Sequence, residues 1–466
     1  MSRVSIKTKL INWLKDNYIN FPYFITYLIG KVGNSFNYDI RYGKDFTKIR
    51  KELKETEFLS ADELDKIVLD KLMSMIKYAY ENVPYYQEHF DKNIISKLKN
   101  FSDIECLPMI DKMIVKEYSD KFISNIYSKD SLIKKYTSGS TGIPLKMYMD
   151  KETTLKEWAF VVHIWERIGF NHKSSRLIMR EIDDKNNKKF YYDPIKNELR
   201  IDISSMTDNM MEEYCKAIEK YKPDFIHGYP SATILLCQYL EKRGSLKHQF
   251  KGVLPSSEGM TEDELKYIKR VLKCPVLSFY GHTERLLIAG QCENSNAYHI
   301  EPLYGYCELV DTEGNSIHEC GVTGEIVATG FCNSAMPLIR YKTGDLAQWG
   351  DECVECGRHF KILKKIEGRV TEYLVDNEYH KIPLTSLRYS FIDQNIKMFQ
   401  FYQEIPGLVI FRYIKEKGFS ALDSEYVIKT LVEDTNGKIK FDLIEVNNIS
   451  KKKSGKRELI IQKVTI

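Results

Sequence analysis

The 466-residue sequence lacks the features that mark several classes of protein. It has no low-complexity tract and few prolines, so it is not typical of a disordered or fibrous chain. No apolar run reaches the ~20 residues that are needed to cross a bilayer. Lys15 and Asp16 interrupt the apolar stretch that a secretory signal would require. We therefore expect a cytoplasmic protein without a transmembrane segment.

The sequence also lacks a strong charge imbalance and a disulfide framework. Its 69 basic and 65 acidic residues leave a net charge of +4, and no basic stripe is interleaved with aromatics, so nucleic acid is not an expected partner. Most of the cysteines stand singly in apolar runs, which favours reduced, buried thiols. Examples are Cys215, Cys237, Cys274 and Cys307.

What the sequence does contain is a hydrophobic periodicity that predicts an α/β fold. Residues 60–90 are predicted to form a helix that begins with a capping box of Ser60 and Glu63 and ends at Pro84. From there to about residue 330, short apolar runs alternate with helical patterns, which is typical of a largely parallel sheet. The expected strands include 134–137, 224–228, 252–255 and 275–280, and the expected helices include 153–168, 231–242 and 262–272.

The pattern then changes twice. Between Tyr304 and Trp349, short alternating strands separated by turns predict a smaller β region. After Gly368 the chain has the pattern of a compact α+β segment. We therefore predict a large N-terminal domain over residues 1–367, with mostly parallel sheets plus a β subdomain, and a small α+β C-terminal domain over residues 368–466.

The strongest local motif runs from Tyr136 to Lys146, with the sequence Tyr-Thr-Ser-Gly-Ser-Thr-Gly-Ile-Pro-Leu-Lys. Its glycines let the backbone turn with N–H groups exposed, its hydroxyls add donors, and a lysine follows, which together suit a cradle for an oligophosphate. It is not the P-loop of kinases and GTPases, because no Gly-Lys-Ser/Thr follows at the right spacing. Taken alone, it would also fit a solvated polar turn after a strand.

Four further segments carry side chains suited to a nucleotide. Tyr280 to Glu284 offers a ring for a base, a hydroxyl for a phosphate and a carboxylate for Mg²⁺. Asp345 follows a turn, where its carboxylate can bond ribose hydroxyls. The other two are Gly368-Arg369 and the polar tail loop that carries Lys456. Each alone is more often an ordinary turn, but their order along the chain favours one shared site.

Together these segments resemble the adenylate-forming (acyl-CoA synthetase and luciferase-like) superfamily over nearly the whole chain. Glu81 to Tyr86 and Tyr280 to Arg285 are similar to the phenylacetate–CoA ligase family, and within it to the CapK-like branch associated with capsule and surface-polysaccharide clusters. The resemblance implies an AMP-forming ligase that uses ATP and Mg²⁺. It also implies that the C-terminal domain is mobile and rotates between two half-reactions.

The resemblance implies roles for individual residues. The residues expected to bind the phosphates are Thr137, Ser138, Gly139, Ser140, Thr141 and Gly142, with Lys146 beside them. Ser256, Ser257 and Glu258 would line the adenine, and Tyr280 would lie against it. Asp345 would hold the ribose, assisted by Arg369.

The expected catalytic residues are Lys456, Glu284 and Thr283. Thr283 would contact the α-phosphate, Glu284 would hold Mg²⁺, and Lys456 would bridge the carboxylate and the nucleotide during adenylation. His227 and Tyr229 match the segment near the acyl pocket, although the plain end of a strand explains His227 equally well.

The acid is expected to be a small-molecule carboxylate, and the acyl acceptor is left open. Thr371 stands where family members usually carry an acidic residue or lysine after the hinge arginine, and residues 374–380 show no glycine-rich loop for the CoA arm. CoA, an amine or amino sugar, and a carrier thiol are therefore all candidates. The alternative function is that of a catalytically silent nucleotide-binding relative with a scaffolding role.

A separate pattern indicates a metal site. Cys292 and His299 are followed by Cys353 and Cys356, and the Cys-x2-Cys spacing is typical of zinc. Three thiolates and one imidazole would close a tetrahedral structural site. Reduced surface thiols with an unrelated histidine are the alternative. We predict zinc, because Cys353 and Cys356 lie in a polar loop where free thiols have little packing role.

Overall fold

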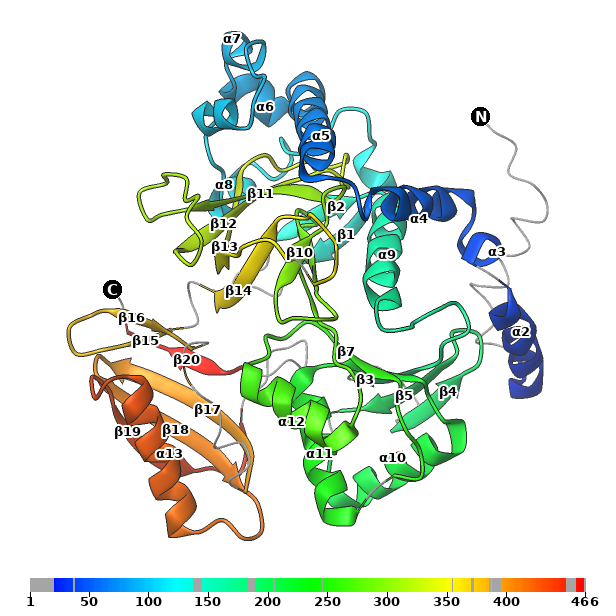
Figure 1. The fold of residues 1–466 in the computed structure, drawn as a ribbon, viewed down its shortest axis with the longest axis vertical. Coiled ribbons are helices and arrows are strands. Elements are labelled where there is room, and N and C mark those ends of the chain that lie inside the picture. Colours follow the sequence, from blue (N-terminus) through cyan, green and yellow to red (C-terminus); the bar gives the residue numbers. More distant parts are fainter. Residues whose placement is uncertain are drawn as a thin grey trace.

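The structure is a computed structural model (Figure 1). It describes residues 21–36, 38–136, 145–180, 182, 189–203, 206–244, 246–353, 355–369, 373–384, 387, 395–449 and 458–464. These residues form a five-stranded sheet, a seven-stranded sheet, a four-stranded sheet and two small two-stranded sheets. The predicted α/β class is confirmed. Within the described ranges, no helix has the length and apolar character that a membrane crossing requires.

The N-terminal helices lead into the long helix α5 (Ala61–Asn82). Its predicted capping box is confirmed, because Ser60 accepts a hydrogen bond from the N–H of Glu63 and donates its own N–H to the Glu63 carboxylate at 3.0 Å. Helix α5 ends before Val83, and Pro84 starts a second helix, as proline does well in a first turn. The other helices of this part are α2 (Tyr23–Ser35), α3 (Tyr38–Tyr42), α4 (Lys44–Thr56), α6 (Pro84–His89), α7 (Lys92–Ile95) and α8 (Lys112–Glu117).

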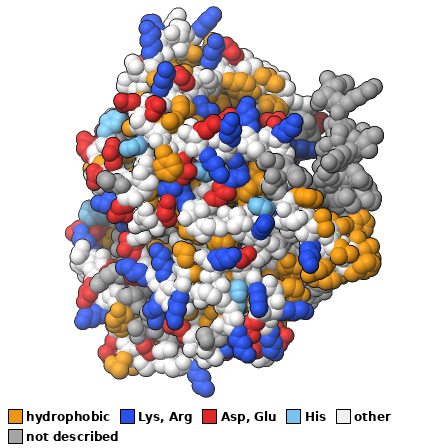
Figure 2. Space-filling view, turned by 45° about the vertical axis from the view of Figure 1, so that its right-hand side comes forward, with side chains coloured by type: hydrophobic (Ala, Val, Ile, Leu, Met, Phe, Trp, Pro, Cys, Tyr) orange, Lys and Arg blue, Asp and Glu red, His pale blue; other side chains and the backbone are white. Residues whose placement is uncertain are grey.

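Helix α2 carries an apolar surface patch at the edge of the molecule (Figure 2). Its first two turns hold no acidic side chain, and its large apolar side chains are exposed rather than packed. They are Tyr23, Phe24, Tyr27, Leu28 and Val32. Only Thr26 and Gly30 of this helix are buried, so α2 contacts the rest of the described chain along a narrow line.

The parallel sheet has the strand order β4-β5-β3-β6-β7. Strands β3 (Arg176–Arg180), β5 (Glu198–Asp202), β6 (Phe225–Gly228) and β7 (Gly252–Pro255) run parallel, and β4 (Phe190–Asp193) is antiparallel at the edge. Helices α10 (Asp208–Tyr221), α11 (Pro230–Arg243) and α12 (Glu262–Leu272) pack their apolar sides on one face of this sheet and close a core. The predicted strand–helix alternation is therefore confirmed between residues 224 and 272.

Two of the predicted strands join other sheets instead. Strand β1 (Ile133–Tyr136) pairs antiparallel with β2 (Lys146–Met149) in a separate hairpin. The run from Pro275 first makes a parallel bridge between Val276 and Val253, and then continues as β8 (Phe279–Gly281) in the antiparallel sheet. This short run therefore connects the two large sheets, which local periodicity could not reveal because both pairings use the same extended backbone.

The antiparallel sheet has the order β11-β12-β13-β14-β10-β9-β8 and forms the predicted β region. Its remaining strands are β9 (Ile288–Gln291), β10 (Tyr298–Ile300), β11 (Gly305–Val310), β12 (Thr323–Gly330), β13 (Tyr341–Trp349) and β14 (Ile362–Arg369). Helix α9 (Lys151–Glu166) joins the two large sheets: Trp165 packs edge-on against His227 of the parallel sheet, and Arg167 forms a buried ion pair with Glu301 beside β10.

The C-terminal residues form a sheet of their own, in the order β19-β18-β17-β20 (Figure 1). Helix α13 (Ala421–Asp434) covers it, and the hairpin of β15 (Tyr373–Val375) and β16 (Lys381–Pro383) lies beside it. The four strands are β17 (Ile396–Ile405), β18 (Leu408–Lys415), β19 (Lys440–Glu445) and β20 (Ile460–Gln462). Gln238 of α11 donates to the carbonyl of Ile396 at 3.0 Å, so this part contacts the helices under the parallel sheet.

We expect Thr261→Ala to lower the free energy of unfolding by about 1 kcal/mol, because it removes a working N-cap. Thr261 accepts from the N–H of Glu264 at 3.2 Å and starts α12 with a reciprocal capping box. The matched control is Thr207→Ala, since Thr207 precedes α10 without a side-chain capping bond. Urea unfolding of both variants should show the loss only for Thr261, and equal effects would contradict this role of the cap.

Candidate functional site

A tyrosine on β8 and an aspartate on β13 of the antiparallel sheet lie side by side. The Tyr280 hydroxyl donates to Asp345 Oδ2 at 2.7 Å, although the two residues lie 65 positions apart. Burial, with Asp345 nearby, raises the pKa of Tyr280 well above its ordinary value, so the phenol keeps its proton and stays a donor. Asp345 is therefore a buried carboxylate that a hydrogen bond holds in place. A carboxylate that positions ligand hydroxyls needs to be fixed in this way.

The turn before Asp345 is held by its own hydrogen bonds. Gly344 has a φ of +74° and donates its N–H to Glu325 Oε1 at 3.1 Å. The N–H of Asp345 donates to Thr343 Oγ1 at 3.1 Å. Asp345 also pairs in register with Arg369 at the end of β14, so the backbone of the predicted hinge arginine lies next to the predicted ribose ligand.

Thr283 and Glu284 lie in the turn between β8 and β9, directly after Tyr280. Two glycines allow this turn to lie close over the sheet. A Cβ on Gly305 would come within 1.9 Å of the carbonyl oxygen of Leu286, and one on Gly330 within 2.7 Å of that of Arg285. Because any larger residue would push the turn away, the glycines set the height at which Thr283 and Glu284 stand above β11 and β12.

The predicted phosphate loop is bracketed by a strand pair. Tyr136 and Lys146 are register partners in the β1–β2 hairpin, so the two ends of the motif are held side by side. Asn333 is buried and donates to the carbonyl of Tyr148 at 2.9 Å, which fixes β2 to the segment between β12 and β13. Residues Thr137, Ser138, Gly139, Ser140, Thr141 and Gly142 lie outside the described residues, as do Lys456 and the side chain of Arg369.

The segment predicted to line the adenine follows strand β7. The N–H of Ser256 donates to the carbonyl of Gly228 at 3.0 Å, and Ser257 takes a φ of +70°. Glu258 accepts the N–H of Ser231 at 3.1 Å, so its carboxylate caps the N-terminus of α11, where a negative charge is favourable. Glu258 therefore has a structural partner that the sequence did not reveal.

The two residues predicted near the acyl pocket have different surroundings. His227 lies on β6 with Arg176 Nη1 3.3 Å from its Nδ1. Burial and the neighbouring arginines hold the pKa of His227 well below its ordinary value, so its imidazole is neutral near pH 7. Tyr229 is buried at the start of α11, and the guanidinium of Arg180 lies over its ring at 5.6 Å. Arg180 was not predicted.

The four predicted metal ligands meet in space. The ligand atoms of Cys292, His299, Cys353 and Cys356 all lie within 4.8 Å of one another. Cys292 Sγ is 3.8 Å from Cys353 Sγ, and Cys356 Sγ is 3.3 Å from His299 Nε2. A tetrahedral zinc with ordinary bond lengths would separate two sulfurs by ~3.8 Å and a sulfur from a nitrogen by ~3.5 Å. The donor set and its spacing therefore fit zinc.

The position of this cluster explains what a metal would do. Cys292 follows β9 and His299 lies on β10, whereas Cys353 and Cys356 lie between β13 and β14. Burial, with Arg167 and Arg358 nearby, lowers the pKa of His299 to about 4, so its ring is neutral. An ion would link the β9–β10 turn to the loop that follows the strand of Asp345.

Comparison with known proteins agrees with the resemblance that the sequence shows. No family model matches the sequence. The chain is 24% identical to Protein CapK of Staphylococcus aureus over 441 residues, covering 91% of this chain and 94% of that protein. It is 25% identical to the phenylacetate-coenzyme A ligase of Aromatoleum evansii over 344 residues, covering 70% of this chain and 74% of that protein.

A solved 2-hydroxyisobutyryl-CoA ligase, in its postadenylation state, superposes with a TM-score of 0.68 at 16% identity, covering 88% of this chain and 91% of that one. This likeness shows that the chain has the fold of the adenylate-forming CoA ligases. With the relatives above, the chain is similar to the class of AMP-forming ligases of the phenylacetate–CoA ligase type. Within it, the chain resembles the CapK-like branch, as the sequence predicted.

Proposed function

We propose that this protein activates a small-molecule carboxylate with MgATP and then transfers the acyl group to a second acceptor. In the first step a carboxylate oxygen attacks the α-phosphorus of ATP, the bond to the β-phosphate breaks, and pyrophosphate leaves. In the second step a nucleophile attacks the acyl carbon and AMP leaves. The observation that carries this proposal is the Tyr280–Asp345 pair, a buried carboxylate held ready at 2.7 Å.

Asp345 would accept both ribose hydroxyls, because a carboxylate can take two parallel hydrogen bonds. The ring of Tyr280 would lie against the base, with Ser256 and Ser257 on its other side. Thr283 would donate to the α-phosphate from the turn that the glycines of β11 and β12 hold in place. Glu284 is the residue that would hold Mg²⁺, which would neutralise charge on the phosphates.

Lys146 and the hydroxyls of residues 137–142 would bind the β- and γ-phosphates, since the β1–β2 pairing brings both ends of that segment together. Residues 368–466 would form a mobile domain, with Arg369 at its hinge. Rotation of this domain would bring Lys456 to the carboxylate, where a positive charge stabilises the anion that forms in flight. In the second step, the domain would rotate Lys456 away from the site and leave the same space free for the acceptor.

The acceptor would be CoA, an amine or amino sugar, or a carrier thiol. The resemblance to Protein CapK, in the branch associated with capsule and surface-polysaccharide clusters, supports a place in the assembly of a capsule or surface polysaccharide. The altered hinge at Thr371 and residues 374–380 are the features that keep acceptors other than CoA under consideration.

The test is pyrophosphate release from MgATP across a panel of aromatic, aliphatic, hydroxy and dicarboxylic acids, with hydroxylamine present to trap the activated acyl group. We expect pyrophosphate, AMP and a hydroxamate with at least one acid, and no hydroxamate with Lys456→Ala. Release of ADP would indicate a phosphotransferase instead. ATP binding without turnover for every acid would favour the silent nucleotide-binding relative.

We also propose that Cys292, His299, Cys353 and Cys356 hold a structural zinc ion. The donor set and the separations of 3.8 and 3.3 Å support zinc rather than a disulfide, whose sulfurs would lie ~2.0 Å apart. All four positions are filled by protein ligands, which is typical of a structural site rather than a catalytic one.

A further inference from the structure

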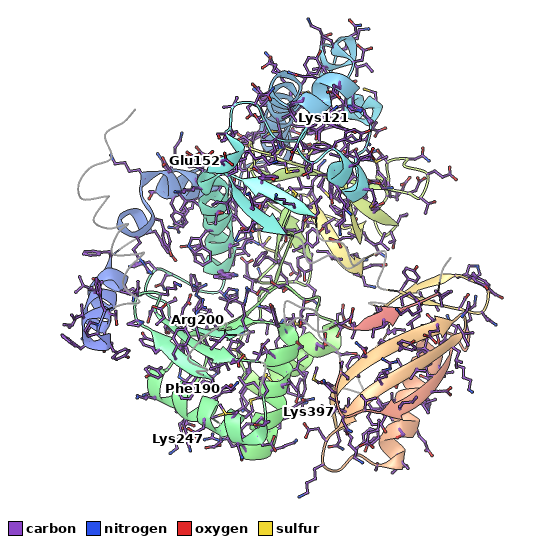
Figure 3. All side chains as sticks on the ribbon, turned by 180° about the vertical axis from the view of Figure 1, so that it is seen from behind. Lys121, Glu152, Phe190, Arg200, Lys247 and Lys397 are labelled. Carbon is purple, nitrogen blue, oxygen red and sulfur yellow. The ribbon has the colours of Figure 1, made fainter. Side chains whose placement is uncertain are left out.

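The parallel sheet has one apolar face and a second face that carries several charged side chains among apolar ones. Leu177 and Met179 of β3 point into the core with α10 and α11. Because side chains alternate along a strand, Arg176 and Arg180 lie on the opposite face. Arg200 of β5 and His227 of β6 are both register partners of Ile178, so they share that second face. Figure 3 shows Arg200 on the side toward the rest of the molecule and Phe190 on the opposite side.

This second face holds more arginine than carboxylate. Glu198 forms ion pairs with two arginines, with Arg176 Nη2 at 2.5 Å and with Arg200 Nε at 3.0 Å. Arg180 forms no ion pair with a carboxylate anywhere in the part of the chain that the structure describes. Its Nη2 donates to Ser256 Oγ at 2.8 Å, and its Nε is buried without a hydrogen-bond partner. A half-buried guanidinium with an unused hydrogen-bond donor costs free energy of folding unless an anion accepts from it.

The surroundings of Arg180 strengthen that argument. Burial lowers its pKa, and Arg200 and Arg176 lower it further, while Glu198 opposes this shift; the guanidinium also lies over the ring of Tyr229 at 5.6 Å. His227 adds no negative charge, since its imidazole is neutral. The guanidinium nevertheless stays charged, because an arginine does not lose its proton in proteins. Arg180 therefore has no ion pair of its own in the described chain: Glu198 offsets part of its charge from a distance, and Asp202, its register partner on β5, pairs with Lys189 at 3.4 Å.

Arg180 also stands where ligands bind in this kind of sheet. It is the last residue of β3, and Gly228 is the last residue of the neighbouring strand β6. The chain leaves β3 toward β4 and β5 on one side and leaves β6 toward β7 on the other. Such a reversal of strand order opens a crevice at the carboxyl ends of the strands, the usual ligand site of open α/β sheets.

We propose that Arg180 binds an anionic group of the acid substrate, separate from the carboxylate that is activated. The substrate would then carry two anionic groups, as a dicarboxylic acid does, or an acid that bears a phosphate. This inference rests on the proposed adenylation function and adds the class of acid to it. A planar guanidinium forms two parallel hydrogen bonds with a carboxylate or phosphate, which Nε and a terminal nitrogen of Arg180 can supply.

The experiment compares matched acids in ATP–pyrophosphate exchange. Glutarate and succinate are the dianionic probes, with 3-phosphoglycerate as the phosphorylated one. Their monoamides, glutaramate and succinamate, have the same length and a single charge. We expect wild type to prefer the dianions and Arg180→Gln to lower kcat/KM for them by on the order of 10²-fold, as two hydrogen bonds to a charged group would. The monoamides should change little.

Two variants control for charge and folding. Lys196→Gln removes the same charge from the β4–β5 turn at the amino end of the sheet, where Lys196 is half exposed, and should leave the preference intact. Arg180→Lys keeps the charge but loses the planar fork, so it should restore part of the activity with the dianions. If KM for ATP rises in Arg180→Gln while the preference among acids is unchanged, Arg180 binds the nucleotide and the inference is wrong.

The other outcomes separate this inference from the proposed function. Exchange with monocarboxylates alone, at equal rates in wild type and Arg180→Gln, would keep adenylation and overturn the role of Arg180. No exchange with any acid would count against adenylation itself. In that case thermal unfolding with the same probes decides: glutarate should stabilise wild type more than Arg180→Gln, and equal stabilisation would overturn the inference.

Discussion

Replacing Asp345 with alanine should reduce kcat/KM for ATP in the adenylation step by about 10²- to 10³-fold. The reason is the loss of the carboxylate that would accept the ribose hydroxyls, because each hydrogen bond to a charged group contributes ~1.5–3 kcal/mol. The effect should fall on ATP rather than on the acid. ATP–pyrophosphate exchange at varied ATP and fixed acid would measure it.

Tyr280→Phe is the matched control for that prediction. It removes the hydroxyl that donates to Asp345 at 2.7 Å but keeps the ring and the carboxylate. We expect a loss of about tenfold, since one hydrogen bond that orients the carboxylate is removed while the ribose ligand stays. If Tyr280→Phe cost as much as Asp345→Ala, the carboxylate would not be the main ligand. An unchanged KM for ATP in Asp345→Ala would refute the assigned role.

Protein purified without chelator should contain about one zinc per chain, and Cys356→Ser should lose it. The ion would hold the β9–β10 turn against the loop after β13, so its loss should lower stability by several kcal/mol, as removal of a tightly bound ligand does. Metal analysis by mass spectrometry and thermal unfolding with and without a chelator would measure both. The adenylation activity should be lost only as the protein unfolds, because a zinc ion with four protein ligands has no position open to substrate.

Cys106→Ser is the control for the metal prediction. Cys106 is an exposed free thiol outside the cluster, so its replacement should change neither the zinc content nor the response to chelator. Wild-type protein that is fully folded and free of metal would remove the proposed zinc site. Loss of zinc from Cys106→Ser would show that the ion binds elsewhere.

Local sequence signals predicted local structure well. The spacing of Ser60 and Glu63 is enough to predict a helix start, because a capping box involves only neighbours in the sequence. The Cys-x2-Cys pair predicted half of the metal cluster for the same reason. Cys292 and His299 were expected to supply the other half, and the four potential ligand atoms do come together, while the zinc itself stays a prediction.

Pairings between distant strands were predictable only in part. The alternation of strands and helices indicated a parallel sheet, but it did not reveal that β1 and β8 belong elsewhere. The hydrogen bond between Tyr280 and Asp345 was also not evident, because it depends on the register of a seven-stranded sheet. The domain boundary near Gly368 and the roles of residues 137–142, Arg369 and Lys456 stay predictions.

Arg180 illustrates the limit most clearly. The spacing of Arg176 and Arg180 within one strand was a visible signal that both side chains share a face. Whether either charge is compensated depended on Glu198, which approaches only when β5 lies beside β3.

The sequence by itself indicated which residues are suited to bind a nucleotide and a metal, because residue type and short spacing set that chemistry. Only the tertiary structure decided which of those side chains already have partners, since burial and ion pairing depend on contacts between distant segments.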